Sequence, residues 1–591
     1  MNRRSRRHPV AAGCGLILVL AGLLTAGAEE PSPYEAVGAP SHPRVPAQWN
    51  RYHDFEQATR LLKQLAEVHR GRARLTSVGK SHGGRELWVL TVTNFRSAPV
   101  TEKPAFWIDG GIHANEIQSV EVVLYTAWYL LESWSRNPTV RRLLDEQVFH
   151  LAPMLSPDSR DAHFYRPNST HTPRTGPRPR DDDRDGRIDE DGPDDLDGDG
   201  HLTQMRVKDD QGRYVPHEDY PDLLVPVKPG RKGQYTLLGQ EGFDNDGDGQ
   251  VNEDGDGWYD PNRNWGWNWQ PAYVQGGADR YPFSIPENRA VADFIMQHPE
   301  IGGAQSFHNA GGMILRGPGA KNDRYEPADV RVLDELAAKG RQMLPRYKYL
   351  EIATELYEVY GGELDWLYQT QGVFALTNEM FPDFNYFGDQ TNGQHLGTPE
   401  AQHEFNKYLL LGEGLVAWKA VDHPQYGRIE VGGLKKTWVR QPPSFMLEEE
   451  CHRNMAFTLY HADQLPLVRV RSIEVKPLDG ELRQVTAVIA NDRLCPTHAA
   501  VDVARKITPP DRVSIQAPQG RVLVGWQSSE PYFLKPIEQE RRPAELRVAS
   551  VPGRGAVYVR WLIEGSGPLQ VTVRSVKGGA HERSWKPAEK R

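Results

Sequence analysis

Four side chains in this sequence carry the groups that a catalytic zinc site needs. His113 and Glu116 lie three residues apart, His308 follows much later, and Glu379 comes after it. Two imidazoles and one carboxylate as protein ligands leave a coordination position open for water, which distinguishes a catalytic zinc from a closed structural one. Glu379 would then be free to act as a general base on that water. These residue types therefore predict a zinc-dependent hydrolase.

The predicted strands place both histidines at one edge of a sheet. His113 follows a short apolar strand expected at residues 105–109, and His308 follows a strand expected at 303–307. Open α/β sheets bind their ligands at the carboxyl ends of the strands, so we expect the two imidazoles on the same rim. Strand and helix signals alternate to about residue 418. The fold class predicted is α/β, with a mixed, mostly parallel sheet flanked by helices.

The pattern of the sequence changes after about residue 425. Short runs rich in β-formers, such as 468–475 and 556–561, are separated by proline and glycine turns. This pattern is typical of a small β-sandwich, which we expect over residues 426–580. A chain of 591 residues is also too long for one compact core. The catalytic domain is accordingly expected at residues 47–425.

The N-terminus has the composition of an export signal. Four arginines within the first seven residues precede an apolar run at 10–24, and Ala26-Gly-Ala28 offers a small-residue cleavage site. The alternative, a permanent membrane anchor, is less favoured because the apolar run is short. We therefore expect residues 1–28 to be removed and the mature protein to be secreted or periplasmic, without stable membrane insertion.

Charge and cysteine content narrow the remaining possibilities. A net charge of −9 gives no sign of a nucleic-acid or membrane-surface binder. Only Cys451 and Cys495 remain after the expected cleavage, and neither has metal-ligand spacing. In an oxidising compartment they could pair, or both could be buried free thiols.

The His-x-x-Glu motif is weak when it stands alone. His113 could be a loop histidine bonded to backbone groups, and Glu116 could be an acid favoured by the helix dipole. Further motifs give it weight. They are Asp260-Pro-Asn262-Arg263-Asn264-Trp265, Ser306-Phe-His308 and Tyr357-x-x-x-Gly361-Gly362-x-x-Asp365-Trp366, with Glu379 thirteen residues after the last. In this order, the motifs between about residues 52 and 416 resemble the zinc carboxypeptidase family of the carboxypeptidase A type.

The resemblance implies a role for each matching residue. Zinc would be bound by His113, Glu116 and His308, and Glu379 would be the catalytic glutamate. Asn262 and Arg263 would grip the terminal carboxylate of the substrate, a role that suits the bidentate guanidinium.

Three more positions are implied by the same resemblance. Tyr357 would be the mobile tyrosine that closes over substrate, although a core aromatic is the alternative for that residue taken alone. Leu364 would line the specificity pocket, where an aliphatic side chain argues against basic or acidic preference. The arginine that stabilises the oxyanion is expected to be Arg174, with Arg206 as the alternative. The match is not clean there, and Asn115 stands where many members carry arginine.

An acidic insertion at about residues 175–258 is the other distinctive feature. Its three loops alternate aspartates and end in glycine: Asp181-x-Asp183-x-Asp185-Gly186-x-x-Asp189, Asp195-x-Asp197-x-Asp199-Gly200 and Asp244-x-Asp246-x-Asp248-Gly249. Alternating oxygens with a glycine at the sharp turn suit calcium, although none of the loops has glutamate at its twelfth position. The alternative is a disordered acidic linker. We expect structural Ca²⁺ rather than a catalytic role.

These observations favour an exported zinc metallocarboxypeptidase acting on peptides or proteins with a free C-terminus. One alternative is a related zinc amidohydrolase that acts on cell-wall peptides or acylated amino acids. A second alternative, from another class, is a calcium-stabilised binding protein without catalytic activity.

Overall fold

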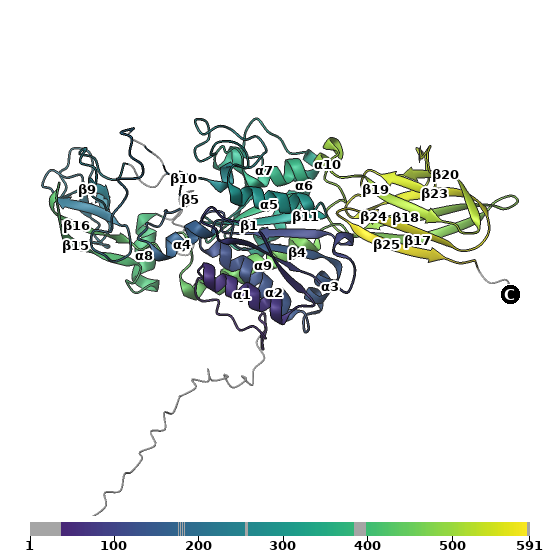
Figure 1. Cartoon of the computed structure of the whole chain (residues 1–591), viewed down its shortest axis with the longest axis horizontal. Helices are drawn as coiled ribbons and strands as arrows, with labels where there is room; N and C mark the ends of the chain where they lie inside the picture. The colour runs from purple at the N-terminus through teal and green to yellow at the C-terminus, as the bar shows by residue number, and fades with distance from the viewer. Residues whose placement is uncertain are drawn as a thin grey trace, which may run out of the picture. The chain divides into compact units, whose positions relative to one another are not determined.

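The structure is a computed structural model of the 591-residue chain (Figure 1). It describes residues 37–174, 176–177, 179, 181, 184–253, 258–382 and 398–587. The expected signal segment and Asp183 lie outside the described residues. Within the described residues, no helix combines the length and apolar character needed to cross a bilayer.

An eight-stranded sheet forms the centre of the catalytic region. Its strands, in spatial order, are β1 (Ala73–Lys80), β2 (Glu86–Val92), β4 (Val148–Ala152), β3 (Ala105–Asp109), β11 (Ile301–Asn309), β14 (Phe374–Met380), β12 (Met313–Arg316) and β13 (Lys348–Glu351). The four central strands, β4, β3, β11 and β14, run parallel. Strands β1, β2 and β12 join by antiparallel pairing. The mixed sheet predicted from the sequence is therefore confirmed.

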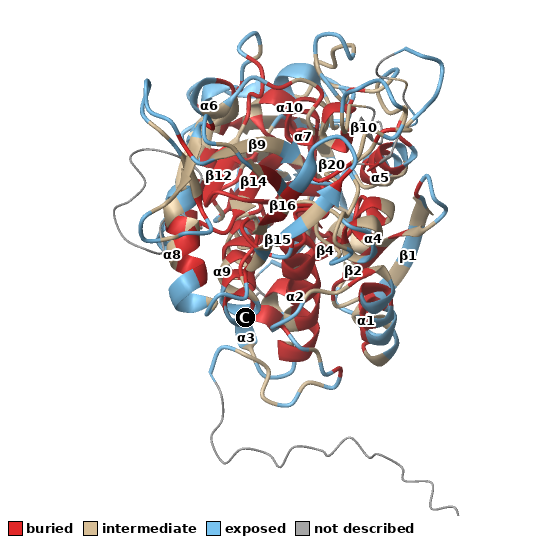
Figure 2. Cartoon of the chain, turned by 90° about the vertical axis from the view of Figure 1, so that its left-hand side faces the viewer, coloured by how far each residue is buried: buried red, intermediate tan, exposed pale blue. Residues whose placement is uncertain are grey.

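Helices cover both faces of this sheet, as the two cores show. Along β3, Phe106 and Ile108 belong to one apolar cluster and Ala105 and Trp107 to another, because successive side chains point to opposite faces. The first cluster packs against α1 (Phe55–Val68), α2 (Gln118–Ser133) and α9 (Ser444–Asp463), and the second against α5 (Pro286–Gln297) and α7 (Glu363–Gln371). Figure 2 shows that α2 is largely buried, whereas α1 also has exposed residues.

Shorter helices complete the catalytic region. They are α3 (Pro138–Glu146), α4 (Pro157–Tyr165), α6 (Pro327–Met343) and α8 (Pro399–Leu409). Helix α3 begins in a typical way: Asn137 accepts hydrogen bonds from the amides of Thr139 and Val140, with Pro138 at the first helical position.

The insertion forms a lobe with a sheet of its own. The strands, in spatial order, are β15 (Leu415–His423), β16 (Gly427–Leu434), β6 (Gln204–Lys208), β9 (Tyr235–Gln240), β7 (Tyr214–Pro216) and β8 (Leu224–Pro226). Strands β5 (Gly176–Pro177) and β10 (Trp258–Tyr259) pair at its stem. The lobe thus uses residues 415–434 in addition to the predicted insertion at 175–258.

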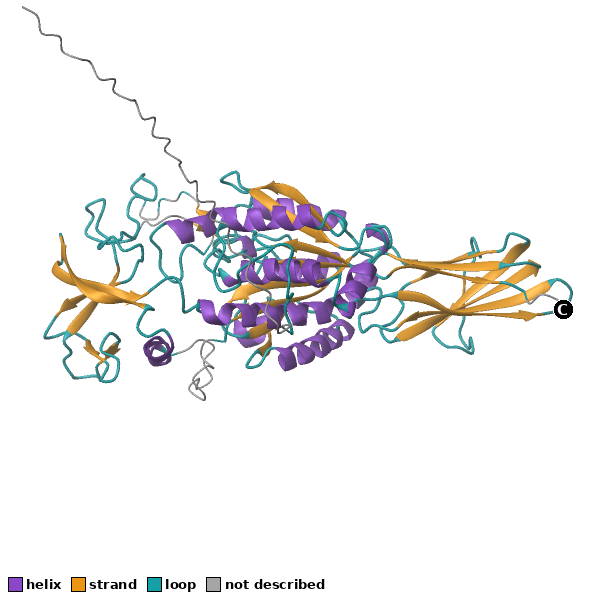
Figure 3. Cartoon of the chain, turned by 90° about the horizontal axis from the view of Figure 1, so that it is seen from below, coloured by secondary structure: helices purple, strands orange, loops and turns teal. Residues whose placement is uncertain are grey.

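The C-terminal domain consists of two antiparallel sheets. The first contains β17 (Val468–Pro477), β18 (Leu482–Asn491), β23 (Gly555–Gly565), β20 (Gly520–Ser528) and β21 (Ile537–Glu538); the second contains β22 (Glu545–Val548), β19 (Asp511–Gln516), β24 (Leu569–Ser575) and β25 (Gly579–Trp585). Apolar side chains of both sheets form one cluster. Strands predominate in this domain (Figure 3), with the short helix α10 (Ala500–Arg505) between β18 and β19. The predicted β-sandwich architecture is therefore confirmed.

The boundary predicted at residue 425 is wrong. It falls in the hairpin β15–β16 of the insertion lobe, and the following helix α9 packs against α2 of the catalytic region. Short β-rich runs belonging to the lobe were indistinguishable in sequence from those of the sandwich, which starts at Val468. The two cysteines are free and buried, Cys451 in the cluster around α2 and Cys495 in the cluster around α6.

A buried charged cluster lies within the C-terminal domain. The Nε2 of His498 is 2.9 Å from Asp511, and its Nδ1 is 2.9 Å from the Thr508 hydroxyl and 3.4 Å from Asp502. Lys577 contacts Asp502 at 3.2 Å and donates to the carbonyl of Gly372 at the end of α7. Burial would lower the pKa of His498, but the two aspartates raise it to about 9.

Candidate metal centre

The four residues singled out in the sequence meet at the carboxyl ends of the central strands. His113 and Glu116 lie in the turn between β3 and α2. His308 lies in β11, one residue before its end rather than after it, and its register partner on the parallel strand β14 is Glu379. The side chains of His113, Glu116 and His308 are at most 2% exposed. The rim predicted from the strand order is thus where these residues lie.

The donor atoms of the three expected ligands converge on one point. The Nδ1 atoms of His113 and His308 are 3.1 Å apart. The Glu116 oxygens lie 3.0 Å from the first of these atoms and 2.8 Å from the second. Tetrahedral donors at 2.0–2.1 Å from a zinc ion are about 3.3 Å apart. The separations and the mixed nitrogen–oxygen donor set therefore fit a zinc ion.

Asp260 orients the first histidine. Its Oδ1 is 3.0 Å from Nε2 of His113, and it also accepts the backbone amide of Asn262. An imidazole that donates its Nε2 proton to a carboxylate presents the lone pair of Nδ1 to a metal. Burial would raise the pKa of Asp260, but Arg263 and His113 hold it well below its usual value. This role was missed in the sequence, although the carboxylate stands just before Asn262.

Two guanidinium groups contact Glu116 through the oxygen that also faces His113. Arg174 contacts its Oε1 at 2.8 Å and Arg440 contacts the same oxygen at 3.3 Å. Arg440 also donates to the carbonyl of Asn309 at 2.7 Å. Burial would raise the pKa of Glu116, but the two histidines hold it well below its usual value. Nothing in the local sequence identified Arg440, which lies far along the chain from every motif.

Glu379 lies beside this group. Burial, and then the charge of Glu116, raise the pKa of Glu379 to about 7, while His308 and the two arginines oppose the rise. Such a pKa suits a group that accepts and releases a proton near neutral pH. The charge of Glu379 in turn contributes to the raised pKa of Arg174, so the two side chains interact electrostatically.

The expected carboxylate clamp borders the metal centre. Asn262 and Arg263 lie in a 3₁₀ turn at Pro261–Arg263. The amide nitrogen of the Asn262 side chain is 3.5 Å from Nε2 of His308, and its oxygen accepts the backbone amide of Glu363. The guanidinium of Arg263 donates to the carbonyl of Asn262 at 2.6 Å.

The other expected site residues have different environments. Tyr357 ends a π-helical turn and is 49% exposed, so it is free of the core. Tyr357 is among the neighbours that raise the pKa of Arg174, which places it near the centre. Leu364 is 6% exposed and belongs to an apolar cluster of the catalytic region. Arg206 lies on β6 of the insertion lobe, where it pairs with Glu430 at 2.7 Å, away from the metal ligands.

The acidic loops lie in the insertion lobe and recruit carboxylates from outside the repeats. Among the described residues, groups with ligand oxygens within 4.8 Å of one another include Asp185, Glu190 and Asp246; Asp191, Asp246 and Glu253; and Asp195, Asp197 and Glu241. Other loop aspartates accept backbone amides: Asp181 from Arg184, Asp199 from His201, Asp244 from Gly247 and Gly249, and Asp248 from Gln250. Asp189 has positive φ in the first loop.

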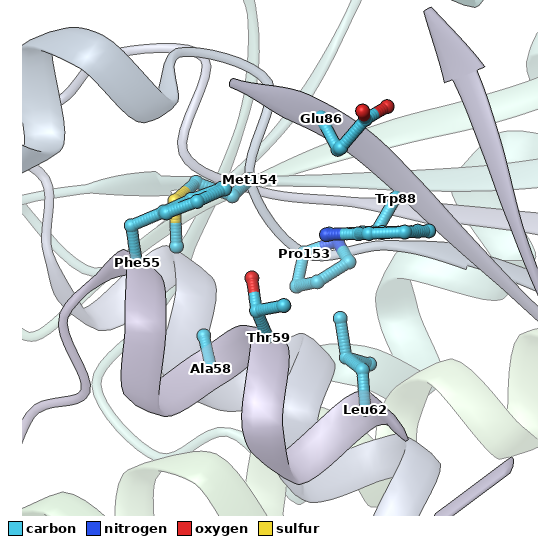
Figure 4. Close-up of a pocket in the computed structure, with 8 residues that line it drawn as sticks. All are labelled: Phe55, Ala58, Thr59, Leu62, Glu86, Trp88, Pro153 and Met154. Carbon is cyan, nitrogen blue, oxygen red and sulfur yellow. The ribbon is translucent and has the colours of Figure 1, made fainter.

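A small pocket between α1 and the sheet has no part in this centre. Figure 4 shows its eight lining residues, which include Thr59 and Leu62 of α1 and Trp88 of β2. None of the eight is an expected metal ligand, catalytic residue or substrate-binding residue.

Comparison with known proteins agrees with this arrangement. The zinc carboxypeptidase family matches residues 58–179 and 248–394, and a domain of unknown function, DUF8731, matches residues 467–586. The first match stops and resumes around the insertion lobe, and the second begins next to β17. The match boundaries thus follow the observed architecture.

The matches to individual relatives cover only part of the length of each relative. A zinc carboxypeptidase of Saccharothrix mutabilis subsp. capreolus is 32% identical over 113 residues, which are 19% of this chain and 26% of that protein. Carboxypeptidase A2 of Mus musculus is 22% identical over 348 residues, 57% of this chain and 64% of that protein. The chain therefore spans less than two thirds of either relative.

Solved structures show similarity at low identity. The crystal structure of thrombin-activatable fibrinolysis inhibitor gives a TM-score of 0.42 at 17% identity, covering 71% of this chain and 76% of that one. Carboxypeptidase A from Helicoverpa armigera gives 0.38 at 19% identity, covering 58% and 67%.

Proposed function

This chain belongs to the zinc carboxypeptidase family through residues 58–179 and 248–394, and we propose that it is a metallocarboxypeptidase that hydrolyses C-terminal peptide bonds. The observation that carries the proposal is the convergence of His113, Glu116 and His308, with Glu379 on the neighbouring strand. Three ligands with a carboxylate beside them are what activation of a water molecule requires.

The chemistry follows from the charges around this point. When bound, zinc supplies a Lewis acid that lowers the pKa of a water molecule to about 7 and polarises a carbonyl group. Glu379 accepts a proton from the attacking water and delivers it to the leaving amine. Asp260 keeps His113 in the tautomer that presents Nδ1 to the metal.

The specificity for chain ends rests on the residues next to His308. Arg263 and Asn262 bind the terminal carboxylate of the substrate, the first through a charged fork and the second through a neutral amide. Arg174 stabilises the negative charge that develops on the carbonyl oxygen. Tyr357, being exposed, closes over the bound substrate, and Leu364 borders the side-chain pocket.

The wider setting of the enzyme is proposed from the sequence. The basic and apolar N-terminal segment directs export, so the mature protein acts in the periplasm or outside the cell on peptides or proteins with free C-termini. Ca²⁺ bound by the acidic loops is proposed as a structural cofactor beside the catalytic zinc.

Product analysis with matched peptides tests the proposal. A peptide library with free C-termini is incubated with the zinc-loaded enzyme, beside the same peptides as C-terminal amides. We expect release of single C-terminal residues from the free peptides and about 100-fold slower release from the amides, because a buried guanidinium loses its anionic partner. Equal rates on both would contradict the carboxylate clamp.

The second candidate is a zinc amidohydrolase acting on acylated amino acids, and adding N-acyl amino acids to the same assay separates it from the peptidase. Such an enzyme would cleave N-acyl amino acids but leave the library peptides intact. The presence of Asn262 and Arg263 beside His308 favours the peptidase.

A further inference from the structure

Three carboxylates of the insertion lobe come together around one point. One ligand oxygen from each of Asp195, Asp197 and Glu241 lies within 4.8 Å of the others. Asp195 and Asp197 belong to the second acidic loop, while Glu241 immediately follows strand β9 and belongs to no motif in the sequence. The fold, rather than the repeat, completes this group.

Asp197 has an oxygen that nothing in the described chain satisfies. Its side chain is 5% exposed, and its Oδ1 has no hydrogen-bond partner among the described residues. Leaving a buried acceptor without a donor costs about 1–3 kcal/mol, and more when the group is charged. Asp197 belongs to the same group as Asp195 and Glu241, so a cation bound by this group would give its buried carboxylate the missing partner.

Positive charge near the three acids comes from Lys419 and from Lys436, whose pKa burial lowers although the charge of Asp195 opposes the fall. The Lys419 ammonium lies 3.6 Å from the other oxygen of Asp197, but the lysine side chain is 60% exposed. An exposed ion pair contributes about 0–1 kcal/mol. Glu241 is only 1% exposed, and burial, with the charge of Asp197, raises its pKa.

The arrangement of the loop directs oxygens inward. Asp195 accepts the backbone amides of Gly198, Asp199 and Gly200, and both glycines have positive φ. The loop is therefore tightly turned around the Asp195 carboxylate. Donors that are all oxygen favour a hard cation, and an irregular loop accommodates the six to eight ligands of Ca²⁺ better than the strict octahedron of Mg²⁺.

We propose that Asp195, Asp197 and Glu241 form a Ca²⁺ site in the insertion lobe. The site shares no residue with the zinc centre, so it stands or fails independently of the peptidase activity. Thr203, the residue just before β6, positions the Glu241 carboxylate by donating hydrogen bonds to it from its backbone amide and its hydroxyl. Calcium would join the second acidic loop to the end of β9.

The site is connected to the two arginines beside Glu116. His201, directly after the loop, forms a β-bridge with Asn168, and its Nδ1 accepts the amide of Lys436 at 3.3 Å. Asn168 lies six residues before Arg174, and Lys436 lies four residues before Arg440. Calcium would therefore stabilise the segments that bring both guanidinium groups to the metal centre.

Calcium titration of the zinc-loaded full-length protein tests the site. Calcium is removed, zinc is restored to one equivalent and checked by mass spectrometry, and CaCl₂ or MgCl₂ is added in a calorimeter. We expect wild-type protein to bind calcium more tightly than magnesium and its Tm to rise by about 5 °C at saturation. Asp197→Asn should lose one equivalent of calcium and most of that rise, with its zinc content unchanged.

Two further variants keep the test decisive. Asp210→Asn removes the same charge from an exposed position of the same lobe and should leave calcium binding unchanged. Glu241→Gln should repeat the loss seen with Asp197→Asn. The proposal is overturned if wild-type protein binds no calcium, if Asp197→Asn keeps the full stoichiometry, or if Asp210→Asn causes an equal loss.

Discussion

A buried cluster of histidine and carboxylate side chains at the ends of β3 and β11 can be compared with another in the C-terminal domain. In the first, the Nδ1 atoms of His113 and His308 face each other at 3.1 Å. In the second, both nitrogens of His498 face oxygens, from Asp511 on one side and Thr508 on the other. The composition is similar, but the direction of the lone pairs differs.

That difference separates a metal site from an ion-pair cluster. Two imidazole nitrogens that face each other cannot both carry protons, so a cation between them satisfies both lone pairs. A single imidazole between acids is instead protonated, and His498 has a pKa raised to about 9. Histidine and acid content therefore predicts little by itself. The converging atoms decide the chemistry.

The largest effect should come from replacing the base beside the first cluster. In Glu379→Gln the proton acceptor is lost while all three ligands remain, so kcat should fall about 10²–10⁴-fold with zinc content unchanged. Steady-state kinetics and metal analysis on the same preparation measure both. Turnover close to wild type would refute the assignment of Glu379.

The second cluster should respond to pH rather than to metal. His498 stays protonated in the folded chain up to about pH 9 but in the unfolded chain only to about pH 6.5. The folded state therefore holds the extra proton between these values, and the stabilisation, up to about 3 kcal/mol, is fully present below pH 6.5 and lost as pH rises through 9.

His498→Gln makes this contribution measurable. The Tm gap between wild type and the variant should be wide at pH 6 and narrower at pH 9.5 in calorimetric scans. A gap that stays constant over this range would show that His498 is neutral in the folded chain. Zinc affinity, measured beside it, should be the same in both proteins.

A smaller effect is expected from the carboxylate that orients His113. Asp260→Asn keeps the shape but removes the charge behind the imidazole, so zinc affinity should fall about 10–100-fold. Competition with a chelator of known affinity measures the change. If the variant binds zinc as tightly as wild type, the contact between Asp260 and His113 is structural only.

Local motifs account for what the sequence predicted correctly about the site. His113 and Glu116 are three residues apart in the turn between β3 and α2, and the strands that carry His308 and Glu379 are buried along almost their whole length, as is typical of central parallel strands. Because the carboxyl ends of parallel strands meet at one edge of the sheet, the positions of these residues near strand ends predict that they lie together. The mixed sheet follows from the same alternation of strands and helices.

Residues delivered by long-range packing escaped prediction. Arg440 reaches Glu116 only because the hairpin β15–β16 completes the sheet of the insertion lobe and the chain then returns to form α9. Glu241 joins the second acidic loop through the position of β9, which no spacing rule encodes. The domain boundary predicted at residue 425 was misplaced for the same reason, because the sequence of the hairpin β15–β16 does not show which sheet the hairpin joins.

The register of β11 and β14 limits how far the metal ligand His308 and the base Glu379 can move relative to one another. His308 and Glu379 are paired residues on adjacent parallel strands, so the distance between their backbones is fixed by the 4.7–4.9 Å spacing of a sheet. The alignment of ligand and base is therefore a property of the backbone ladder, which is rigid and buried. Enzyme that is partly denatured should lose activity as an all-or-none fraction of molecules rather than by gradual misalignment in each one.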